Sequence, residues 1–469
     1  MHTSTTSTVP LVSWTAAQLL EATQGYWLND QAPNTEIKRI LTDSRDAEAG
    51  DAFLALKGER FDAHAFITQV AEQGCQVAIV SQPIDAEICQ LVVPDTRLAL
   101  GQLGAYRRAQ NPQLKVIALT GSSGKTTTKE MLGSILSRIA PTLVTRGNLN
   151  NDLGVPVMLL ELCPEHQYAV MELGASHQGE IDYTSSLVQP LVAGIINIGT
   201  AHLGEFGGRD GICRAKSEIY AHIAPNGTSI VPAADDFADS IRQAVQTEQV
   251  LSFGAGGEIF ATEIELQAQS ATFKLNTPQG VRQVNLPFAG EHNVQNATAA
   301  AAFALAIGIS LDDIVLGLEQ AVGAKGRLNF IQQGRHLLID DTYNANPTSM
   351  RAAAEVLAQQ EGVRVMVMGD IGELGSSAAQ QHYMLGRDLV SVKGLNFVVA
   401  VGEFAPAAQE GARSTQYGKK MQAFLTQEQA LPFLLSLIET HQPQSMSFLF
   451  KGSRYTHMET LMADLMEKL

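Results

Sequence analysis

Length, composition and charge exclude several classes of protein. The chain has 469 residues, 45% of them hydrophobic, which is enough for about three domains of ordinary size. Its net charge of −16 argues against a nucleic-acid partner or an anionic membrane surface. The four cysteines include no Cys-x-x-Cys pair and predict neither a zinc site nor a disulfide framework. Because no stretch reaches the roughly 18 apolar residues of a membrane span, we expect a cytoplasmic protein without membrane insertion.

The first part of the chain is predicted to be a small α/β domain. Its short apolar segments end near Val92, and a helical stretch then leads through Asn111-Pro112 into the next strand. We therefore expect an N-terminal domain at 1–100.

Residues 116–128 read Val-Ile-Ala-Leu-Thr-Gly-Ser-Ser-Gly-Lys-Thr-Thr-Thr, an apolar strand followed by a glycine-rich turn and a helical run at 129–138. This pattern is typical of a loop that binds nucleotide phosphates, in which Lys125 reaches the outer phosphates and the Thr126 hydroxyl binds Mg²⁺. Leu119 stands where the strict pattern has glycine, so the loop is a shortened variant. A plain glycine turn with an exposed lysine is the alternative, but the flanking strand and helix favour ATP or GTP binding.

Two series of apolar segments alternate with helical patterns and predict two largely parallel sheets. The first series comprises 116–119, 169–171, 192–198 and 228–231, and the second comprises 336–339, 363–368, 397–401 and 446–450. A β-rich stretch at 250–284 and an alanine-rich helix at 296–309 lie between them. We therefore predict an α/β protein of three domains, with a central parallel-sheet ATPase-like domain at 101–325 and a C-terminal Rossmann-like domain at 326–469.

Three ionisable residues of the central domain are candidates for chemistry. Glu172 ends a strand, and its carboxylate suits Mg²⁺. His202 follows the next strand and could bind a metal or a phosphate, although a lone histidine is more often a structural hydrogen-bonding group. Lys216 lies in a helical run at 210–224, where spacing alone favours a solvated lysine.

Polar residues also gather further along the chain. Asn296 shares a helix face with His292, and its amide could contact a base or a phosphate. Residues 340–347 place two carboxylates, a phenol and two amides after a strand. Lys451 and Arg454 follow another strand and suit carboxylates or phosphates.

In this order the motifs resemble those of the Mur ligases, the ATP-dependent amide ligases of peptidoglycan synthesis and hence of the bacterial cell wall. The resemblance spans nearly the whole chain and is carried by 120–127, Glu172, His202, 214–218, 291–296, 326–327, 341–347 and 451–454. Segments 148–152 and 341–347 are most similar to the member that adds D-alanyl-D-alanine to UDP-N-acetylmuramoyl-tripeptide. The resemblance implies a monomeric enzyme that uses ATP and Mg²⁺, forms an acyl phosphate, and closes around a hinge at 323–326.

The resemblance also implies roles for individual residues. The implied nucleotide contacts are Thr120, Gly121, Ser122, Ser123, Gly124, Lys125, Thr126, Thr127, Asn296, Arg327 and Asp341. The implied catalytic residues are Lys125, Glu172, His202 and Lys216, with Thr126, Glu172 and His202 at the metal and Lys216 carbamoylated by CO₂. The implied substrate contacts are Thr42, Ser44 and Arg45 for the uridine part of the substrate, Asn148 for a part not specified, and Asn344, Asn346, Lys451, Ser453 and Arg454 for the dipeptide.

Three alternatives remain open at this stage. The preceding ligase of the pathway usually carries an Asp-Asn-Pro-Arg string, which this chain lacks in its third domain. Folylpolyglutamate synthase shares the ATP module but would not need the N-terminal unit. In a nucleotide-gated switch, ATP would only drive domain closure, and phosphate release would not require an acceptor and an amine together.

Overall fold

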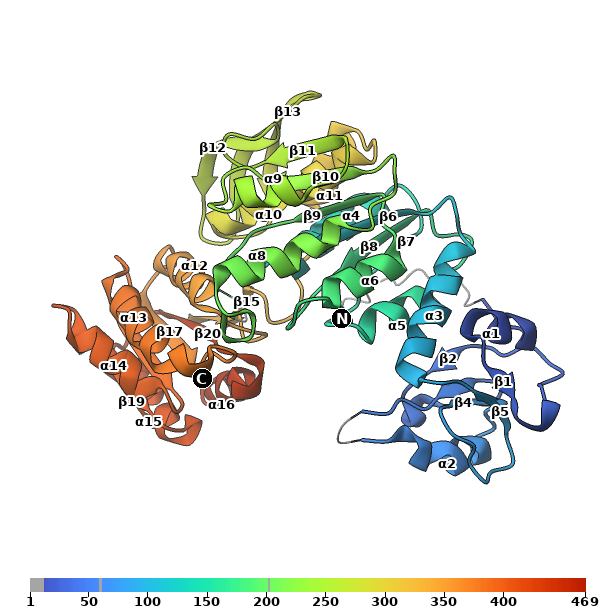
Figure 1. Cartoon of the computed structure of the whole chain (residues 1–469). Helices are drawn as coiled ribbons and strands as arrows, with labels where there is room; N and C mark the ends of the chain where they lie inside the picture. The colour runs from blue at the N-terminus through green and yellow to red at the C-terminus, as the bar shows by residue number, and fades with distance from the viewer. Residues whose placement is uncertain (1–11, 59–60, 201–202) are drawn as a thin grey trace.

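The computed structural model describes residues 12–58, 61–200 and 203–469. Figure 1 shows three lobes: the N-terminal lobe in blue and the C-terminal lobe in orange and red lie on either side of a green and yellow central lobe. Among the described residues, no helix combines the length and the apolar character needed to cross a membrane.

The N-terminal lobe is built on a five-stranded sheet. Its strands are β1 (Tyr26–Trp27), β2 (Ile40–Leu41), β3 (Ala52–Leu54), β4 (Val77–Val80) and β5 (Cys89–Val92). They lie in the order β1-β5-β4-β3-β2, with β1 antiparallel to its neighbour. Helices α1 (Ala16–Thr23) and α2 (Ile67–Glu72) belong to this lobe. Helix α3 (Thr96–Ala109) contains residue 100, the expected boundary, and packs against both α1 and the central α5 (Gly154–Leu160).

The central lobe contains a six-stranded sheet in which every pair of neighbours is parallel. Its strands are β6 (Lys115–Thr120), β7 (Thr142–Val144), β8 (Tyr168–Glu172), β9 (Val192–Ile195), β10 (Thr228–Pro232) and β11 (Gln249–Phe253). The order is β11-β10-β9-β6-β8-β7, so β6 lies inside the sheet and is buried from Val116 onwards. Helix α4 (Lys125–Ser137) begins four residues before the predicted run, directly after the glycine-rich turn.

Two other predictions for this lobe need correction. Strand β9 ends at Ile195, because residues 196–198 leave the sheet and turn toward the glycine-rich loop. The predicted helical run at 210–224 is interrupted: α8 (Arg209–Ser217) ends before a 3₁₀ turn (Glu218–Tyr220). Helix α6 (Glu180–Val188) packs beside this turn.

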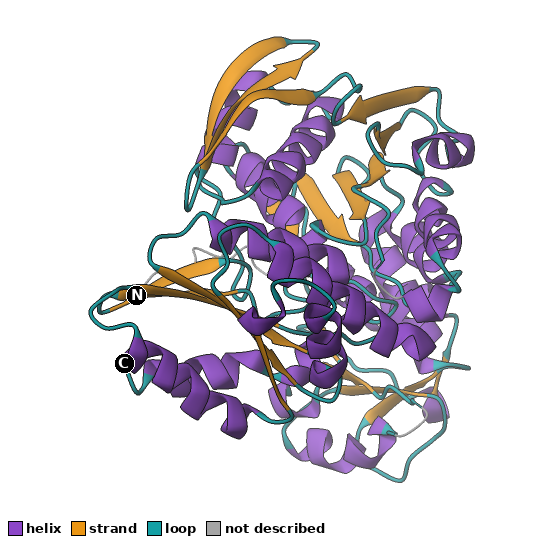
Figure 2. Ribbon diagram, turned by 90° about the vertical axis from the view of Figure 1, so that its left-hand side faces the viewer, coloured by secondary structure: helices purple, strands orange, loops and turns teal. Residues whose placement is uncertain are grey.

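A smaller antiparallel sheet completes the central lobe. It comprises β12 (Phe260–Leu266), β13 (Ala271–Thr277) and β14 (Gly280–Leu286), drawn as a curved sheet at the top of Figure 2. Helix α10 (Glu291–Ala306) packs against α4, β11 and β12, with α11 (Leu311–Glu319) beside it. The alanines at 299–302 are fully buried, because only small side chains fit where α10 approaches its neighbours so closely. Since α10 begins five residues before the prediction, the polar segment 291–296 is helical.

The C-terminal lobe is a second six-stranded sheet with helices on both faces. Its strands are β15 (Asn329–Gln333), β16 (His336–Asp340), β17 (Val363–Gly369), β18 (Phe397–Val401), β19 (Met421–Phe424) and β20 (Met446–Lys451). The order is β15-β16-β20-β17-β18-β19, with only β15 antiparallel. One face carries α12 (Pro347–Ala358), α13 (Ala378–Ser391) and α14 (Ala405–Arg413), and the other α15 (Gln427–Thr440) and α16 (Met458–Met466). The four predicted strands are confirmed, and β15 and β19 were not predicted.

Candidate active site

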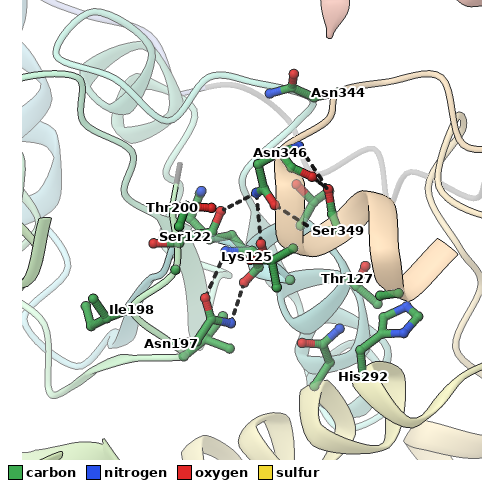
Figure 3. Close-up of a pocket in the computed structure, with 18 of the residues that line it drawn as sticks. Ser122, Lys125, Thr127, Asn197, Ile198, Thr200, His292, Asn344, Asn346 and Ser349 are labelled. Atoms are coloured by element: carbon green, nitrogen blue, oxygen red, sulfur yellow. Dashed lines mark hydrogen bonds between the residues drawn. The ribbon is translucent and has the colours of Figure 1, made fainter. Parts of the chain in front are cut away.

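A cavity of about 970 Å³ lies between the central and C-terminal lobes. Its lining comes from the glycine-rich loop, the carboxyl ends of β8 and β9, the start of α10, and the loops that follow β16 and β20. Figure 3 shows side chains of both lobes meeting around the loop. Polar groups at the carboxyl ends of two parallel sheets therefore face one space, which is where α/β proteins bind their ligands.

The geometry of the loop is that of a phosphate site. Gly124 has φ +77°, and a Cβ atom there would lie 2.2 Å from Asn296 Oδ1, so glycine is required on both grounds. Helix α4 starts at Lys125, and the amides of its first turn have no acceptor within the helix. The Lys125 Nζ atom donates to the Gly121 carbonyl at 2.8 Å. Burial lowers the pKa of Lys125, while the Glu172 carboxylate opposes that shift.

Glu172 presents one carboxylate oxygen without a partner. Its Oε1 atom accepts a hydrogen bond from Asn150 Nδ2 at 2.7 Å, and its backbone N–H donates to Thr145 Oγ1 at 3.0 Å. Its Oε2 atom is buried and has no hydrogen-bond partner among the described residues. The same holds for the buried hydroxyls of Thr120, Ser122 and Thr200. A buried carboxylate oxygen without a partner is the kind of donor that fits a hard cation such as Mg²⁺.

Lys216 is buried in the central lobe, with a relative exposure of 2%, so its interpretation as a solvated lysine is wrong. Burial and the neighbouring Lys125 cation lower the pKa of Lys216 well below its usual value, while Glu172 opposes them. Burial thus acts against the charged form of this amine. His202, the other candidate of this region, lies outside the described residues.

Helix α10 contributes polar side chains to the site, and hydrogen bonds hold two of them in place. Asn293 Nδ2 donates to the Ala289 carbonyl at 2.8 Å, and Asn296 Nδ2 donates to Asn293 Oδ1 at 3.0 Å. This chain of bonds leaves Asn296 Oδ1 directed at Gly124. His292 lies on the same helix, and burial lowers its pKa to about 4, so the imidazole is neutral at physiological pH.

The C-terminal lobe presents a buried ion pair. Lys451 Nζ donates to Asp341 Oδ2 at 2.6 Å and to the Asn344 carbonyl at 3.0 Å. The guanidinium of Arg327 lies over the Tyr343 ring, 4.4 Å from its centroid. Asn346 donates to Ser123 Oγ at 3.0 Å across the gap between the lobes. The two lobes are thus in direct contact at the phosphate loop.

The cavity brings together most residues singled out from the sequence. Those that line it are Ser122, Ser123, Gly124, Lys125, Thr126, Thr127, Asn148, Glu172, Asn296, Arg327, Asp341, Asn344, Asn346, Lys451 and Arg454. Thr120, Gly121 and Lys216 are buried but do not line the cavity, and Ser453 is buried with its hydroxyl accepting from the Gly372 N–H at 2.7 Å. Thr42, Ser44 and Arg45 belong to the N-terminal lobe and do not line the cavity, and the exposed Arg45 pairs with Asp43.

Among the lining residues without an assigned role in the sequence analysis, three have polar side chains close to the candidate chemistry. They are Asn150, which holds Glu172, Asn197, which contacts the phosphate loop, and Glu373 on the loop after β17. Asn197 follows β9 in the structure, and the one sequence signal that pointed to it was a polar side chain near the end of the apolar segment 192–198. The partners of all three side chains depend on the tertiary fold.

Comparison with known proteins finds that this chain is similar to ligases that bind nucleotides. Family models match at residues 36–118 (Mur ligase family, catalytic domain), 119–304 (Mur ligase middle domain) and 326–454 (Mur ligase, glutamate ligase domain). The UDP-N-acetylmuramoyl-tripeptide--D-alanyl-D-alanine ligase of Escherichia coli K12 is 41% identical, over 97% of this chain and 99% of its own. The crystal structure of MurF from Acinetobacter baumannii is 76% identical, covers 98% of this chain and 100% of its own, and superposes with a TM-score of 0.95.

A more distant structure carries a nucleotide. MurF ligase from Thermotoga maritima in complex with ADP is 25% identical, covers 92% of this chain and 97% of its own, and has a TM-score of 0.79. A folylpolyglutamate synthase from Mycobacterium tuberculosis, at 16% identity and TM-score 0.63, shares the fold alone and covers 79% of this chain. Three matched domains and relatives similar along nearly their whole length lead to one conclusion: the chain belongs to the Mur ligase family.

Proposed function

We propose that this chain is the ATP-dependent ligase that joins D-alanyl-D-alanine to UDP-N-acetylmuramoyl-tripeptide and releases the pentapeptide precursor of peptidoglycan, ADP and phosphate. The observation that carries the proposal is similarity over nearly the full length to ligases of that name, 41% to the one from Escherichia coli, together with the phosphate loop in the interlobe cavity. The terminal carboxylate of the tripeptide attacks the γ-phosphate of ATP. The dipeptide amine then displaces phosphate from the resulting acyl phosphate.

The first step brings two anions together, and the residues of the cavity offset their repulsion. Lys125 and the first-turn amides of α4 hold the outer phosphates and stabilise the charge that moves during transfer. Arg327 adds a second cation from the C-terminal lobe. Closure of this lobe over the loop excludes water, which would otherwise hydrolyse the acyl phosphate.

Mg²⁺ would be held by the free Oε2 atom of Glu172 and the Thr126 hydroxyl, with His202 as a further ligand. When bound, the ion neutralises phosphate charge during transfer. The fit is supported by the orphaned, buried oxygen of Glu172, which lies beside the phosphate loop. Carbamoylation of Lys216, in which its neutral amine adds CO₂ and loses one proton, would place a further anionic group next to Lys125 and Glu172. The buried position of Lys216 supports this modification.

The remaining assignments are part of the same proposal. Residues 1–100 bind the UDP end of the substrate through Thr42, Ser44 and Arg45, 101–325 bind ATP, and 326–469 bind the dipeptide. Asn148 lies on the substrate path of the central lobe, and Asn344, Asn346, Lys451, Ser453 and Arg454 belong to the dipeptide pocket. Lys451 reaches that pocket as part of its ion pair with Asp341. The enzyme acts as a monomer in the cytoplasm, where its small-molecule substrates are soluble.

Phosphate release from ATP and Mg²⁺ tests the proposal directly. With UDP-N-acetylmuramoyl-tripeptide present, we expect release only when D-alanyl-D-alanine is added, and a product with the mass of the pentapeptide. Release with a different amine in place of the dipeptide would move the chain to another member of the family. Release that needs no acceptor would favour a nucleotide switch.

A further inference from the structure

The phosphate loop is held by a segment outside itself. Only residues 121–124 separate the end of β6 from the start of α4. The chain that leaves β9 runs beside this loop: the Ile196 N–H donates to the Thr120 carbonyl at 2.8 Å, and the Ser122 N–H donates to the Asn197 carbonyl at 3.1 Å. The loop backbone is therefore paired with residues that follow the neighbouring strand.

The side chain of Asn197 extends this pairing to the next residue. Its Oδ1 atom accepts from the Ser123 N–H at 2.9 Å, and its Nδ2 atom donates to the Ser123 carbonyl at 2.9 Å. Figure 3 shows Asn197 against one side of the loop. A side-chain amide offers one acceptor and one donor in a plane, so it satisfies both main-chain groups of one residue at once. A carboxylate of the same shape would place an acceptor against the Ser123 carbonyl.

This contact determines which amides are offered to a nucleotide. Because the N–H groups of Ser122 and Ser123 are bonded to Asn197, the next amides along the chain that remain for phosphate oxygens are those of Gly124 and the first turn of α4. Gly124 makes the turn with φ +77° immediately after the clamped residue. Because Ser123 is held in place, the N–H groups at the start of α4 point toward the phosphates in one direction.

We propose that Asn197 is a positioning residue of the nucleotide site, which orders the shortened phosphate loop by bonding both main-chain groups of Ser123. It acts through the loop and does not contact the reacting atoms. The inference rests on the proposed function only in that a nucleotide is the ligand of this loop. The loop that Asn197 orders binds the β-phosphate, which ADP has and AMP lacks. The loss of Asn197 therefore weakens ADP binding far more than AMP binding.

The test compares the binding of ADP and AMP, each by competition against a fluorescent ADP analogue. In Asn197→Ala we expect ADP affinity to fall about 10- to 100-fold, as for the loss of one or two buried hydrogen bonds, with AMP affinity changed less than about threefold. Asn197→Asp should behave the same way, because it keeps one acceptor and loses the donor. It also provides the test if the alanine variant does not fold.

Asn111→Ala is the matched control. Asn111 Nδ2 donates to the carbonyls of Cys163 and His166 in the same lobe and does not line the cavity, so its removal costs comparable stability without touching the loop. The control should bind ADP as the wild type does. ADP affinity within about twofold of wild type in both Asn197 variants would overturn the proposal. So would equal losses for ADP and AMP, which indicate general damage. The assay contains no acceptor or dipeptide, so its outcome is independent of the ligase reaction.

Discussion

Asn346 of the C-terminal lobe donates from Nδ2 to Ser123 Oγ of the phosphate loop at 3.0 Å, although the two residues are 223 positions apart. Asn346 is also the N-cap of α12, where its side chain accepts from the Ser349 N–H. At the other end of this helix, Gln360 donates to the Ala268 carbonyl of the central lobe at 2.6 Å. The two ends of α12 are therefore both hydrogen-bonded to the central lobe. The N-terminal end is bonded to the phosphate loop, and the C-terminal end is bonded to Ala268.

Asn346→Ser separates the two roles of this residue. Serine is a good N-cap, so α12 should keep its stability within about 0.5 kcal/mol, but the shorter side chain does not reach Ser123. We expect kcat/KM for ATP to fall about tenfold, as for the loss of one hydrogen bond that aligns the lobes. Steady-state phosphate release and thermal melting measure the two effects. Asn346→Ala should also lose the helix cap, at a further cost of about 1 kcal/mol in stability. Wild-type kinetics in Asn346→Ser would show that the Asn346–Ser123 hydrogen bond has no role in ATP use.

Two glycines with similar backbones offer a matched pair of substitutions. Gly124 (φ +77°) and Gly179 (φ +87°) are the N-cap residues of α4 and α6. Alanine at either position should destabilise the fold by roughly 1–2 kcal/mol, because the left-handed region disfavours a Cβ atom. At Gly179 that atom meets open space, but at Gly124 it would lie 2.2 Å from Asn296 Oδ1. Only Gly124→Ala should therefore lose ADP binding in calorimetry, and equal binding by the two variants would contradict the assigned loop geometry.

What the sequence predicted depended on local patterns. The strand and turn around the phosphate loop were predicted because apolar runs, glycines and lysine are adjacent in the chain. The start of α4 was missed because its first turn is polar and has no apolar periodicity, since it faces the ligand space. The burial of Lys216 was missed for a related reason: its position in a helical run does not reveal which face the fold covers.

Contacts over long sequence separations could not be predicted in this way. Asn197 is 74 residues from Ser123, and Asn150 is 22 residues from Glu172. These pairs exist because parallel strands align their carboxyl ends at one edge, and the sequence alone does not specify which strands are neighbours. The family resemblance predicted nucleotide-binding roles for Arg327 and Asp341, but not the ion pair between Asp341 and Lys451.

That ion pair changes how a substitution of Asp341 must be interpreted. Asp341→Ala should weaken ATP use, but it also leaves the buried Lys451 ammonium without its carboxylate, at a cost of about 3–5 kcal/mol. Lys451→Met in the same chain removes the unpaired charge, so the double variant should be more stable than Asp341→Ala alone. Chemical denaturation measures this difference, and KM for ATP should stay raised in both. A double variant less stable than Asp341→Ala would show that the Lys451 ammonium is compensated by other groups.

Lys216 and Lys129 are both buried lysines of the central lobe, yet only the first should respond to added carboxylates. Lys216→Ala should lower phosphate release about 10- to 100-fold or more, because it would remove the anionic carbamate proposed beside the metal. Short carboxylic acids such as acetate or formate should restore part of this activity by occupying the vacated space. Lys129 serves as the control: its Nζ atom donates to the Thr145 carbonyl at 2.6 Å, so the same acids should not restore phosphate release in Lys129→Ala. Wild-type rates in Lys216→Ala would refute the carbamate.

His292 predicts how stability depends on pH. Burial lowers the pKa of this imidazole from its ordinary 6.5 to about 4, so between these values the unfolded chain binds a proton that the folded protein does not. Stability should thus be unaffected above pH 7 and should fall as the pH decreases toward 4, by about 3 kcal/mol in full. His292→Gln removes the titrating group, so between pH 7 and pH 5 the wild type should lose about 2 kcal/mol more than this variant in denaturant titrations. Parallel losses in the two proteins would mean that His292 is protonated in the folded state. The Asp341 carboxylate, which raises the pKa of His292, would then outweigh burial and the Lys451 cation, which both lower it, and the ring would be positively charged.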